Sequence, residues 1–278
     1  MTNRWLHLRR GGMPLILAIP HAGTRIPESV ERALHSPWLA RKDTDWWARR
    51  LYEFAYERDI TILATEMSRT VIDVNRDPEG VSLYPGQETT GLCPLTTFDG
   101  EVLYKAGREP DLAEIGERRR CYFDPYHDAL AGEIDRLRRQ WGMILLYDAH
   151  TIRSKIPRLF KGTLPHFNIG TDNGRTCAPD LVASLEGICT ASGLTTVVNG
   201  RFRGGWTTRH YANPPAGIHT LQIELACRAY MDEPAGGPKP ENWPAGFDSR
   251  RAAKARRTLS ELLDTCLHFT ALQQQRCR

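Results

Sequence analysis

The sequence has no long hydrophobic run. Nowhere among its 278 residues do about 18 apolar residues follow one another, which argues against a transmembrane helix. The opening residues MTNRWLHLRRGG contain no apolar signal core. A composition of 41% hydrophobic and 25% charged residues also excludes collagen-like, coiled-coil and disordered chains. We therefore expect a cytoplasmic globular protein with no membrane partner.

Closely spaced cysteine pairs are also missing. The sequence has no CxxC motif, and its seven cysteines are odd in number and widely scattered. This pattern is poor evidence for a disulfide framework or a thiolate zinc site, and it favours reduced thiols. The cysteines are Cys93, Cys121, Cys177, Cys189, Cys227, Cys266 and Cys277.

Lysine is scarce, and no long run carries charge of one sign. The net charge is +4, and the 37 basic residues comprise 31 arginines and 6 lysines. Since basic residues alternate with acidic ones, a nucleic-acid partner is not expected. Arginine binds carboxylates and phosphates through a planar, bidentate fork, so the bias favours an anionic ligand. Genome composition alone would produce the same bias.

Hydrophobic periodicity predicts alternating strands and helices. The predicted strands cover residues 14–19, 60–64, 71–74, 143–147, 195–198 and 218–225. The predicted helices include residues 47–55, 124–141, 181–188 and about 248–272, the last after a Pro/Gly-rich linker at 234–246. No internal repeat or domain boundary is evident. The pattern indicates a single α/β domain over residues 1–278, with helices on both faces of a mixed, mainly parallel sheet.

Two local signals refine this outline. Asp124 followed by Pro125 is typical of a helix N-cap with proline in the first helical position. The Gly/Pro/Thr-rich stretch 78–100 is too long for an ordinary connection, so we expect a functional loop there.

Histidines follow two of the predicted buried strands. His21 comes after PLILAIP, and His150 comes after MILLYDA. In α/β proteins with such sheets, ligands bind beyond the carboxyl ends of the strands. We expect the side chains of both histidines to meet there. A hydrolytic zinc site takes three protein ligands and keeps one position open. The pair therefore predicts a site for one divalent metal ion, preferably zinc, although a single histidine at a strand end is more often structural.

The third ligand is expected from the RKDTDWW segment. We assign Asp45 as the ligand and Asp43 as the helix cap, with Asp43 as the next candidate ligand. Asp148 lies two residues before His150. It is a candidate for a residue that does not bind the metal itself but orients His150.

Glu224 is the candidate general base. It lies in LQIEL, where a carboxylate inside an apolar strand is costly unless it is paired or used. A buried salt bridge to an arginine is an equally good explanation.

Several arginines in predicted loops are candidates for holding substrate carboxylates. They are Arg69 in MSRTV, Arg76 in DVNRDP, and Arg203 and Arg209 in RFRGGWTTRHY. His210 is a candidate for lining the same pocket, whereas His127, early in a helix, is expected to be structural.

Seven motifs together resemble the N-formylglutamate amidohydrolase family, in the same order from about residue 13 to 230. The motifs are IPHAGTRIP (19–27), DTDWW (43–47), SRTVIDVNR (68–76), TTGLCP (89–94), DPYHDAL (124–130), LLYDAHT (145–151) and RGGWTTRHY (203–211). More distantly, DAHT, DVNR and QIEL resemble motifs of the aspartoacylase and zinc carboxypeptidase group.

The resemblance implies a zinc carboxypeptidase-like fold, a zinc-bound water, a glutamate base and an Asn-Arg pair that grips substrate. Carried over, Asn75 and Arg76 match the pair, and Thr90 of TTGLCP joins the substrate-binding residues. His21, His150 and Glu224 match the metal ligands and the base. One departure concerns Thr24, which occupies the position of the group's carboxylate ligand and cannot replace it.

The resulting hypothesis is a metal-dependent hydrolase that cleaves N-formyl-L-glutamate to formate and L-glutamate, the last step of one route of histidine degradation. The alternatives are a hydrolase of another N-acyl amino acid, a carboxypeptidase-like peptidase, and a non-catalytic binder of acidic ligands. In each case the partner is a small anionic molecule. The sequence leaves the oligomeric state open.

Overall fold

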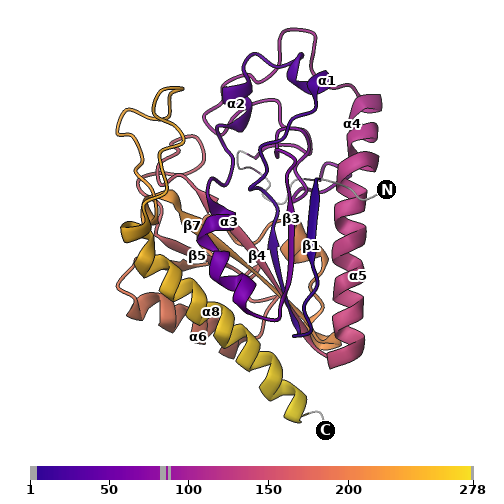
Figure 1. Cartoon of the computed structure of the whole chain (residues 1–278), viewed down its shortest axis with the longest axis vertical. Helices are drawn as coiled ribbons and strands as arrows, with labels where there is room; N and C mark the ends of the chain where they lie inside the picture. The colour runs from indigo at the N-terminus through magenta and orange to yellow at the C-terminus, as the bar shows by residue number, and fades with distance from the viewer. Residues whose placement is uncertain (1–4, 82–85, 87–88, 277–278) are drawn as a thin grey trace.

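A mixed sheet forms the centre of the molecule in this computed structural model, which describes residues 5–81, 86 and 89–276 (Figure 1). In this part of the chain the sheet has seven strands in the order β1-β3-β2-β4-β7-β5-β6. The strands are β1 (Leu6–Arg9), β2 (Leu15–Ile19), β3 (Thr61–Thr65), β4 (Ile144–Ile152), β5 (Phe167–Gly170), β6 (Thr196–Val198) and β7 (Ile218–Ala226). The inner strands β3, β2, β4 and β7 are parallel to one another, whereas β1 and β5 pair antiparallel with β3 and β7.

Helices cover both faces of the sheet, so the predicted fold class is confirmed. The helices are α1 (Glu28–Glu31), α2 (Pro37–Arg41), α3 (Ala48–Leu51), α4 (Leu112–Arg118), α5 (Asp124–Trp141), α6 (Pro179–Ala191), α7 (Trp206–His210) and α8 (Ser249–Arg276). One core contains side chains of α3, α6 and α8, and the other contains side chains of α5. Figure 1 shows α8 and α6 on the opposite side of the sheet from α5. None of the helices in the described part of the chain combines the length and hydropathy needed to cross a bilayer.

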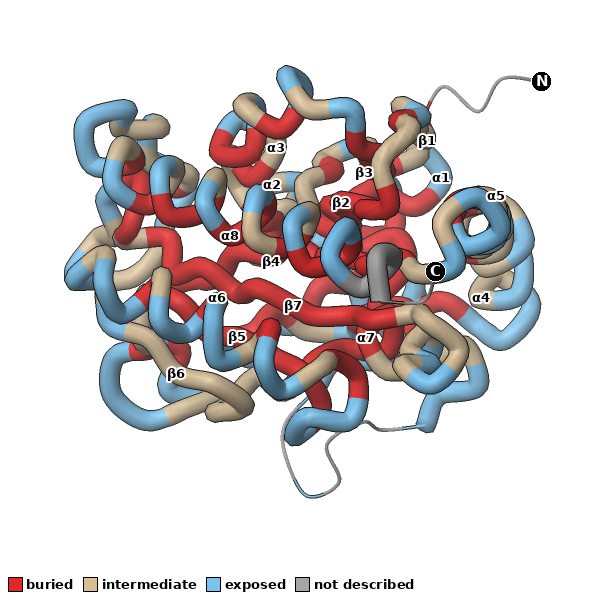
Figure 2. Tube along the Cα trace, turned by 90° about the horizontal axis from the view of Figure 1, so that it is seen from below, coloured by how far each residue is buried: buried red, intermediate tan, exposed pale blue. Residues whose placement is uncertain are grey.

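The inner strands are buried along almost their whole length because both of their faces are covered. All residues of β2 and β4 are buried, and Figure 2 shows β4 and β7 as buried traces between helices with exposed outer turns. A strand that packs against apolar side chains on both faces of the sheet needs apolar residues at every position. This requirement explains the continuous runs PLILAI and MILLY, which predicted β2 and the first half of β4 correctly.

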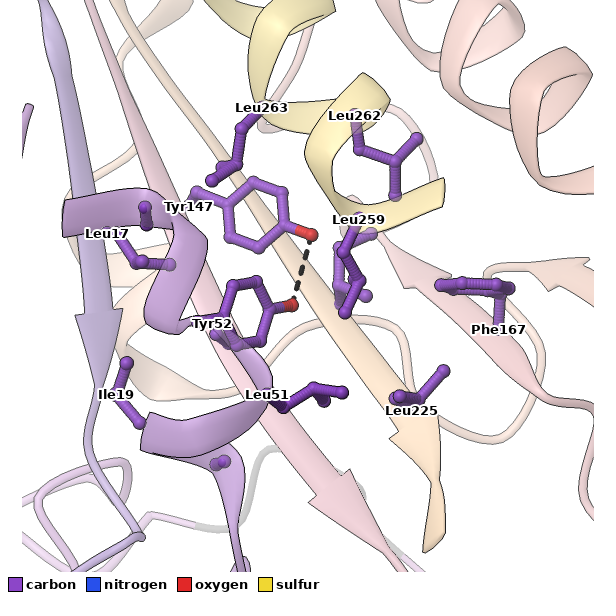
Figure 3. Close-up of a cluster of buried hydrophobic side chains, with 14 of the residues drawn as sticks. Leu17, Ile19, Leu51, Tyr52, Tyr147, Phe167, Leu225, Leu259, Leu262 and Leu263 are labelled. Carbon is purple, nitrogen blue, oxygen red and sulfur yellow. Dashed lines mark hydrogen bonds between the residues drawn. The ribbon is translucent and has the colours of Figure 1, made fainter. Parts of the chain in front are cut away.

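A pair of tyrosines lies inside the larger core. Tyr52 and Tyr147 are fully buried, and their hydroxyl oxygens lie 3.1 Å apart within hydrogen-bonding distance (Figure 3). Leu259, Leu262 and Leu263 of α8 belong to the same core. Burial raises the pKa of both tyrosines, so both remain neutral. The mutual hydrogen bond satisfies polar groups that would otherwise be costly in this position.

Several local predictions were wrong. Residues 71–74 form turns instead of a strand, because the Val71 carbonyl accepts hydrogen bonds from the side chains of Arg118 and Cys93. Asp124 is not an N-cap, because α4 continues through a π-helical stretch, Arg119–Phe123, into α5. The helix predicted over 47–55 divides into α3 and a 3₁₀ helix, Glu53–Glu57.

Two short strands, β1 and β5, were missed. Each has four residues, too few for a period to be read from the sequence. The predicted C-terminal helix at about 248–272 corresponds to α8. Cys277 and part of the stretch 78–100 lie outside the described residues.

Candidate functional site

Two histidines meet at the carboxyl edge of the sheet. His21 follows β2, and His150 lies near the end of β4, the parallel neighbour of β2. The two Nδ1 atoms lie 3.1 Å apart, and both side chains are buried. Each Nε2 faces a carboxylate: His21 Nε2 lies 2.7 Å from Asp73 Oδ1, and His150 Nε2 lies 3.0 Å from Asp148 Oδ2. When Nε2 donates its proton to the carboxylate, Nδ1 keeps a lone pair that faces the other histidine.

Asp45 completes this group from the segment before α3. Its Oδ2 lies 3.4 Å from His150 Nδ1 and 4.0 Å from His21 Nδ1. The carboxylate is fixed by the Thr151 N–H, which donates to Oδ2 at 3.0 Å, and the Asp45 N–H donates to the His21 carbonyl at 3.0 Å. Ligand atoms of His21, Asp45 and His150 all lie within 4.8 Å of one another.

The donor set fits a zinc-like ion. In their neutral forms His21 and His150 each present an Nδ1 lone pair to the same point, and two nitrogens with one carboxylate oxygen are a common set of zinc ligands. The carboxylates behind the two histidines fix the ring orientations that such a site needs. Asp148, proposed from the sequence as an orienting residue, occupies that position for His150. Asp73 does the same for His21 and was not assigned this role.

Asp43 does not cap a helix, so this prediction was wrong. The residue before α3 is Trp47, which has φ 63° and makes no capping hydrogen bond with its side chain. Instead, the Phe98 N–H donates to Asp43 Oδ2 at 2.6 Å, and Arg153 pairs with Oδ1 at 3.0 Å. Asp43 therefore ties the loop that contains Phe98 to the end of β4. A contact so distant in sequence leaves no local signal.

Burial and neighbouring charges shift the pKa values of the two histidines in opposite directions. Burial lowers the pKa of His21, and Arg69 adds to that shift. At His150 burial also lowers the pKa, but the carboxylates of Asp148, Asp45 and Glu224 together raise it well above its ordinary value. At Asp73 burial opposes ionisation, but the charges of Arg76, His21 and Arg69 hold its pKa well below the usual range.

Glu224 lies on β7 directly beside His150, its register partner on β4. The side chain is buried, and burial raises its pKa to about 8. Gln222 Nε2 donates to Glu224 Oε2 at 3.1 Å. Among the residues that the structure describes, no arginine forms an ion pair with Glu224, which removes the structural explanation that the sequence left open.

A cavity of about 260 Å³ opens at this edge. Its lining includes both histidines, Glu224 and four of the predicted substrate-binding residues, Arg69, Asn75, Arg76 and Thr90. The first part of the long loop, up to Val81, and its later part, from Thr89, contribute to the wall.

Arg69 and Arg76, two of the arginines that line the cavity, are fixed in different ways. The Arg69 guanidinium lies 2.7 Å from Asp73 Oδ2 and 3.6 Å from Asp45 Oδ1, and it lies 4.8 Å from the ring centroid of Phe98. Arg76 donates from Nε to the Thr90 carbonyl at 2.9 Å and from an Nη atom to Thr90 Oγ1 at 3.0 Å. Thr90 therefore orients Arg76.

Asn75 makes its hydrogen bonds within the protein. The Thr207 N–H donates to Asn75 Oδ1 at 2.8 Å, which sets the orientation of the amide. Asn75 Nδ2 then faces Asp148 Oδ2 at 3.2 Å and His150 Nε2 at 3.0 Å. The amide donates to Asp148 Oδ2 and so helps to orient that carboxylate behind His150. Asn75 also lines the cavity, and its substrate-gripping role stays a prediction.

Three predicted pocket residues lie outside the cavity lining. Arg203 is exposed, Arg209 Nε donates to the Gly204 carbonyl at 3.1 Å, and exposed His210 stacks on Trp206. The structure instead brings Arg201 and Phe202 of the same segment to the cavity. Sequence reasoning missed Arg201 because adjacent loop arginines are equivalent until the loop's path is known.

His127 has a structural environment, as expected. Its Nε2 lies 2.8 Å from the Val74 carbonyl, its Nδ1 lies 2.9 Å from the Tyr211 hydroxyl, and burial lowers its pKa to about 3.

The fold and this arrangement together describe an α/β protein with a candidate metal site. Its mixed sheet carries a His-Asp-His group, a buried glutamate and cavity arginines at its carboxyl edge.

The chain belongs to the N-formylglutamate amidohydrolase family, whose model matches residues 13–231. It is 43% identical over 279 residues to an N-formylglutamate deformylase of Pseudomonas putida, covering 99% of this chain and 100% of that protein. A second N-formylglutamate deformylase, from Pseudomonas aeruginosa, is also 43% identical, over 94% of this chain and 96% of that protein.

Solved structures share the fold. The crystal structure of N-formylglutamate amidohydrolase from Ralstonia eutropha JMP134 superposes with a TM-score of 0.75 at 24% identity, covering 96% of this chain and 97% of that one. The gene product Atu2144 from Agrobacterium tumefaciens superposes with a TM-score of 0.70 at 19% identity, with 96% of each chain covered.

Proposed function

We propose that this enzyme hydrolyses N-formyl-L-glutamate to formate and L-glutamate, with the help of one divalent metal ion. The names of the two Pseudomonas relatives support the substrate. The reaction would be the last step of one route of histidine degradation. A cytoplasmic location stays a prediction from the sequence.

The observation that carries the proposal is the approach of the two Nδ1 atoms of His21 and His150 to 3.1 Å. With the Asp45 carboxylate beside them, these residues would hold the ion, and we expect zinc. When bound, such an ion polarises the formyl oxygen and lowers the pKa of a water molecule. Asp73 and Asp148 would keep Nδ1 of each histidine deprotonated and directed at the site.

Glu224 would take the proton of the attacking water and pass it to the leaving nitrogen. Its place beside His150 on the neighbouring strand puts the carboxylate at the same edge as the donor set. The products are then the formate anion and the free amine of glutamate.

Arg69, Arg76 and Arg201 would bind the substrate carboxylates. All three line the cavity, and Thr90 keeps the fork of Arg76 in place. A planar guanidinium gives two parallel hydrogen bonds to a carboxylate, so substrates without these charges would lose both affinity and orientation. The cavity volume of about 260 Å³ suits a small acyl amino acid better than a peptide.

The test combines a substrate panel with the Glu224→Gln variant. Wild-type enzyme, loaded with zinc, cobalt or manganese, is assayed for release of the acid from N-formyl, N-acetyl and N-succinyl glutamate. We expect the highest kcat/KM on the formyl compound. Glu224→Gln should keep its metal content and thermal stability while kcat falls by about a hundredfold or more, because only the proton transfer is lost.

Two outcomes would contradict the proposal. One is a metal-replete, stable Glu224→Gln variant with full activity. The other is a wild-type enzyme that binds metal and does not release formate. A higher kcat/KM on a longer acyl group would redirect the proposal to another N-acyl amino acid.

A further inference from the structure

One backbone segment contacts both sides of the site through two side-chain amides. This segment is residues 205–207, at the start of α7. The Thr207 N–H donates to Asn75 Oδ1, and the Gly205 N–H donates to Gln222 Oε1 at 2.7 Å. Because each backbone N–H selects the amide oxygen, each amide must turn its NH₂ group the other way. Asn75 therefore faces the histidine side of the site, and Gln222 faces Glu224.

The environment of Gln222 leaves this amide little freedom. Gln222 and Glu224 are two residues apart on β7, so their side chains project from the same face. Both are buried, and Gln222 Nε2 donates to Glu224 Oε2 at 3.1 Å. Space for the arrangement depends on Gly205, since a Cβ there would lie 2.4 Å from Asn75 Nδ2.

We propose that Gln222 is a positioning residue for the reaction: its amide, oriented by the Gly205 N–H, fixes the carboxylate of Glu224 in the orientation for proton transfer. This inference rests on the proposed function. A hydrogen bond to one carboxylate oxygen restricts rotation of the group and leaves the other oxygen to meet the attacking water. The sequence pattern shows only a polar residue on the face of Glu224.

The test uses two substitutions of Gln222 in the metal-loaded enzyme. Gln222→Met keeps the shape and removes both hydrogen bonds. Gln222→Glu keeps the acceptor for Gly205, so the local fold is retained, but it replaces the amide donor by a carboxyl group that shares a proton with Glu224. In both variants we expect kcat on N-formylglutamate to fall about tenfold or more, with KM within about twofold of wild type. Gln222 lies in the cavity wall beside Glu224, but the arginines proposed to bind the substrate carboxylates are unchanged.

A matched control is Asn168→Leu. Asn168 is buried on β5 and donates to the backbone carbonyl of Glu224 at 3.2 Å, so it supports the same residue without touching its carboxylate. This variant should lower the melting temperature while kcat per folded, metal-loaded enzyme stays unchanged.

A second background separates positioning from general support. Glu224→Asp keeps a carboxylate but shortens the side chain, so that the carboxylate no longer reaches Gln222. When Gln222→Met is added to Glu224→Asp, kcat should therefore fall by less than about twofold relative to Glu224→Asp alone. The inference is overturned if Gln222→Met keeps wild-type kcat, or if it lowers kcat equally in both backgrounds. The proposed function fails separately, when wild-type enzyme releases no formate or Glu224→Gln remains active.

Discussion

Asp73 offers the sharpest test of how the metal site is held. Its carboxylate is fully buried, and Oδ1 receives His21 Nε2 at 2.7 Å and the Asn75 N–H at 2.9 Å. Oδ2 receives Arg69 at 2.7 Å. Asp73→Asn keeps the shape but offers one oxygen where two are used, so either His21 or Arg69 must face an NH₂ group.

Two magnitudes follow. Losing the partner that orients a metal-binding histidine lowers metal affinity by about 10- to 100-fold, which corresponds to about 1.4–2.7 kcal/mol. Removing one charge of a buried ion pair costs about 3–5 kcal/mol. We expect the free energy of unfolding to fall by an amount at the lower end of this range. The reason is that Arg69 still has Asp45 Oδ1 at 3.6 Å and the ring centroid of Phe98 at 4.8 Å in the variant.

Zinc affinity would be measured by competition with a chromophoric chelator, and stability by urea unfolding of the metal-free protein. Asp77→Asn is the control, since Asp77 lines the same cavity and its carboxylate accepts only the local Glu79 N–H among the hydrogen bonds of the described residues. This control should keep wild-type zinc affinity. A zinc affinity within twofold of wild type in Asp73→Asn would refute the orienting role of Asp73, and with it the assignment of His21 Nδ1 as the ligand atom.

Two further predictions concern specificity and the core. Arg201→Gln removes a charged guanidinium from the cavity wall. We therefore expect the ratio of kcat/KM for N-formylglutamate to kcat/KM for N-formylglutamine to fall by about tenfold. The control is Arg203→Gln, at an exposed position, which should leave this ratio within twofold of wild type. Equal ratios in the two variants would rule out Arg201 as the reader of that carboxylate. Leu259→Ala, at a fully buried position of α8, should lower the free energy of urea unfolding by about 3 kcal/mol and leave zinc affinity unchanged. A loss below about 1 kcal/mol would contradict the packing described.

Much of the site could be located from the sequence because it is attached to strands. PLILAI and MILLY are continuous apolar runs typical of a strand covered on both faces, and the polar residues that follow such runs are expected at the sheet edge. His21 and His150 were found in this way, and Glu224 was found as a carboxylate inside an apolar strand. Their closeness follows from the parallel pairing of β2, β4 and β7.

The residues on loops could not be resolved in the same way. Arg201 and Arg203 are two positions apart in one loop, yet only Arg201 lines the cavity. Asp43 is of a residue type that often caps helices, but its carboxylate accepts a hydrogen bond from the Phe98 N–H, in a loop 55 residues away. The path of a loop is set by such distant contacts, and they leave no periodic trace.

The sequence by itself determined the α/β class, the buried strands and the chemical types of residue at the sheet edge, because hydrophobic burial imposes a period that can be read locally. Only the tertiary structure decided that Asp73 stands behind His21, and that Asn75 and Gln222 are oriented by one backbone segment. Hydrogen-bond direction depends on atoms brought together from several elements. Asp73, Thr207 and Gly205 acquire their roles only through that assembly, whereas Asp148 could be proposed from its spacing to His150.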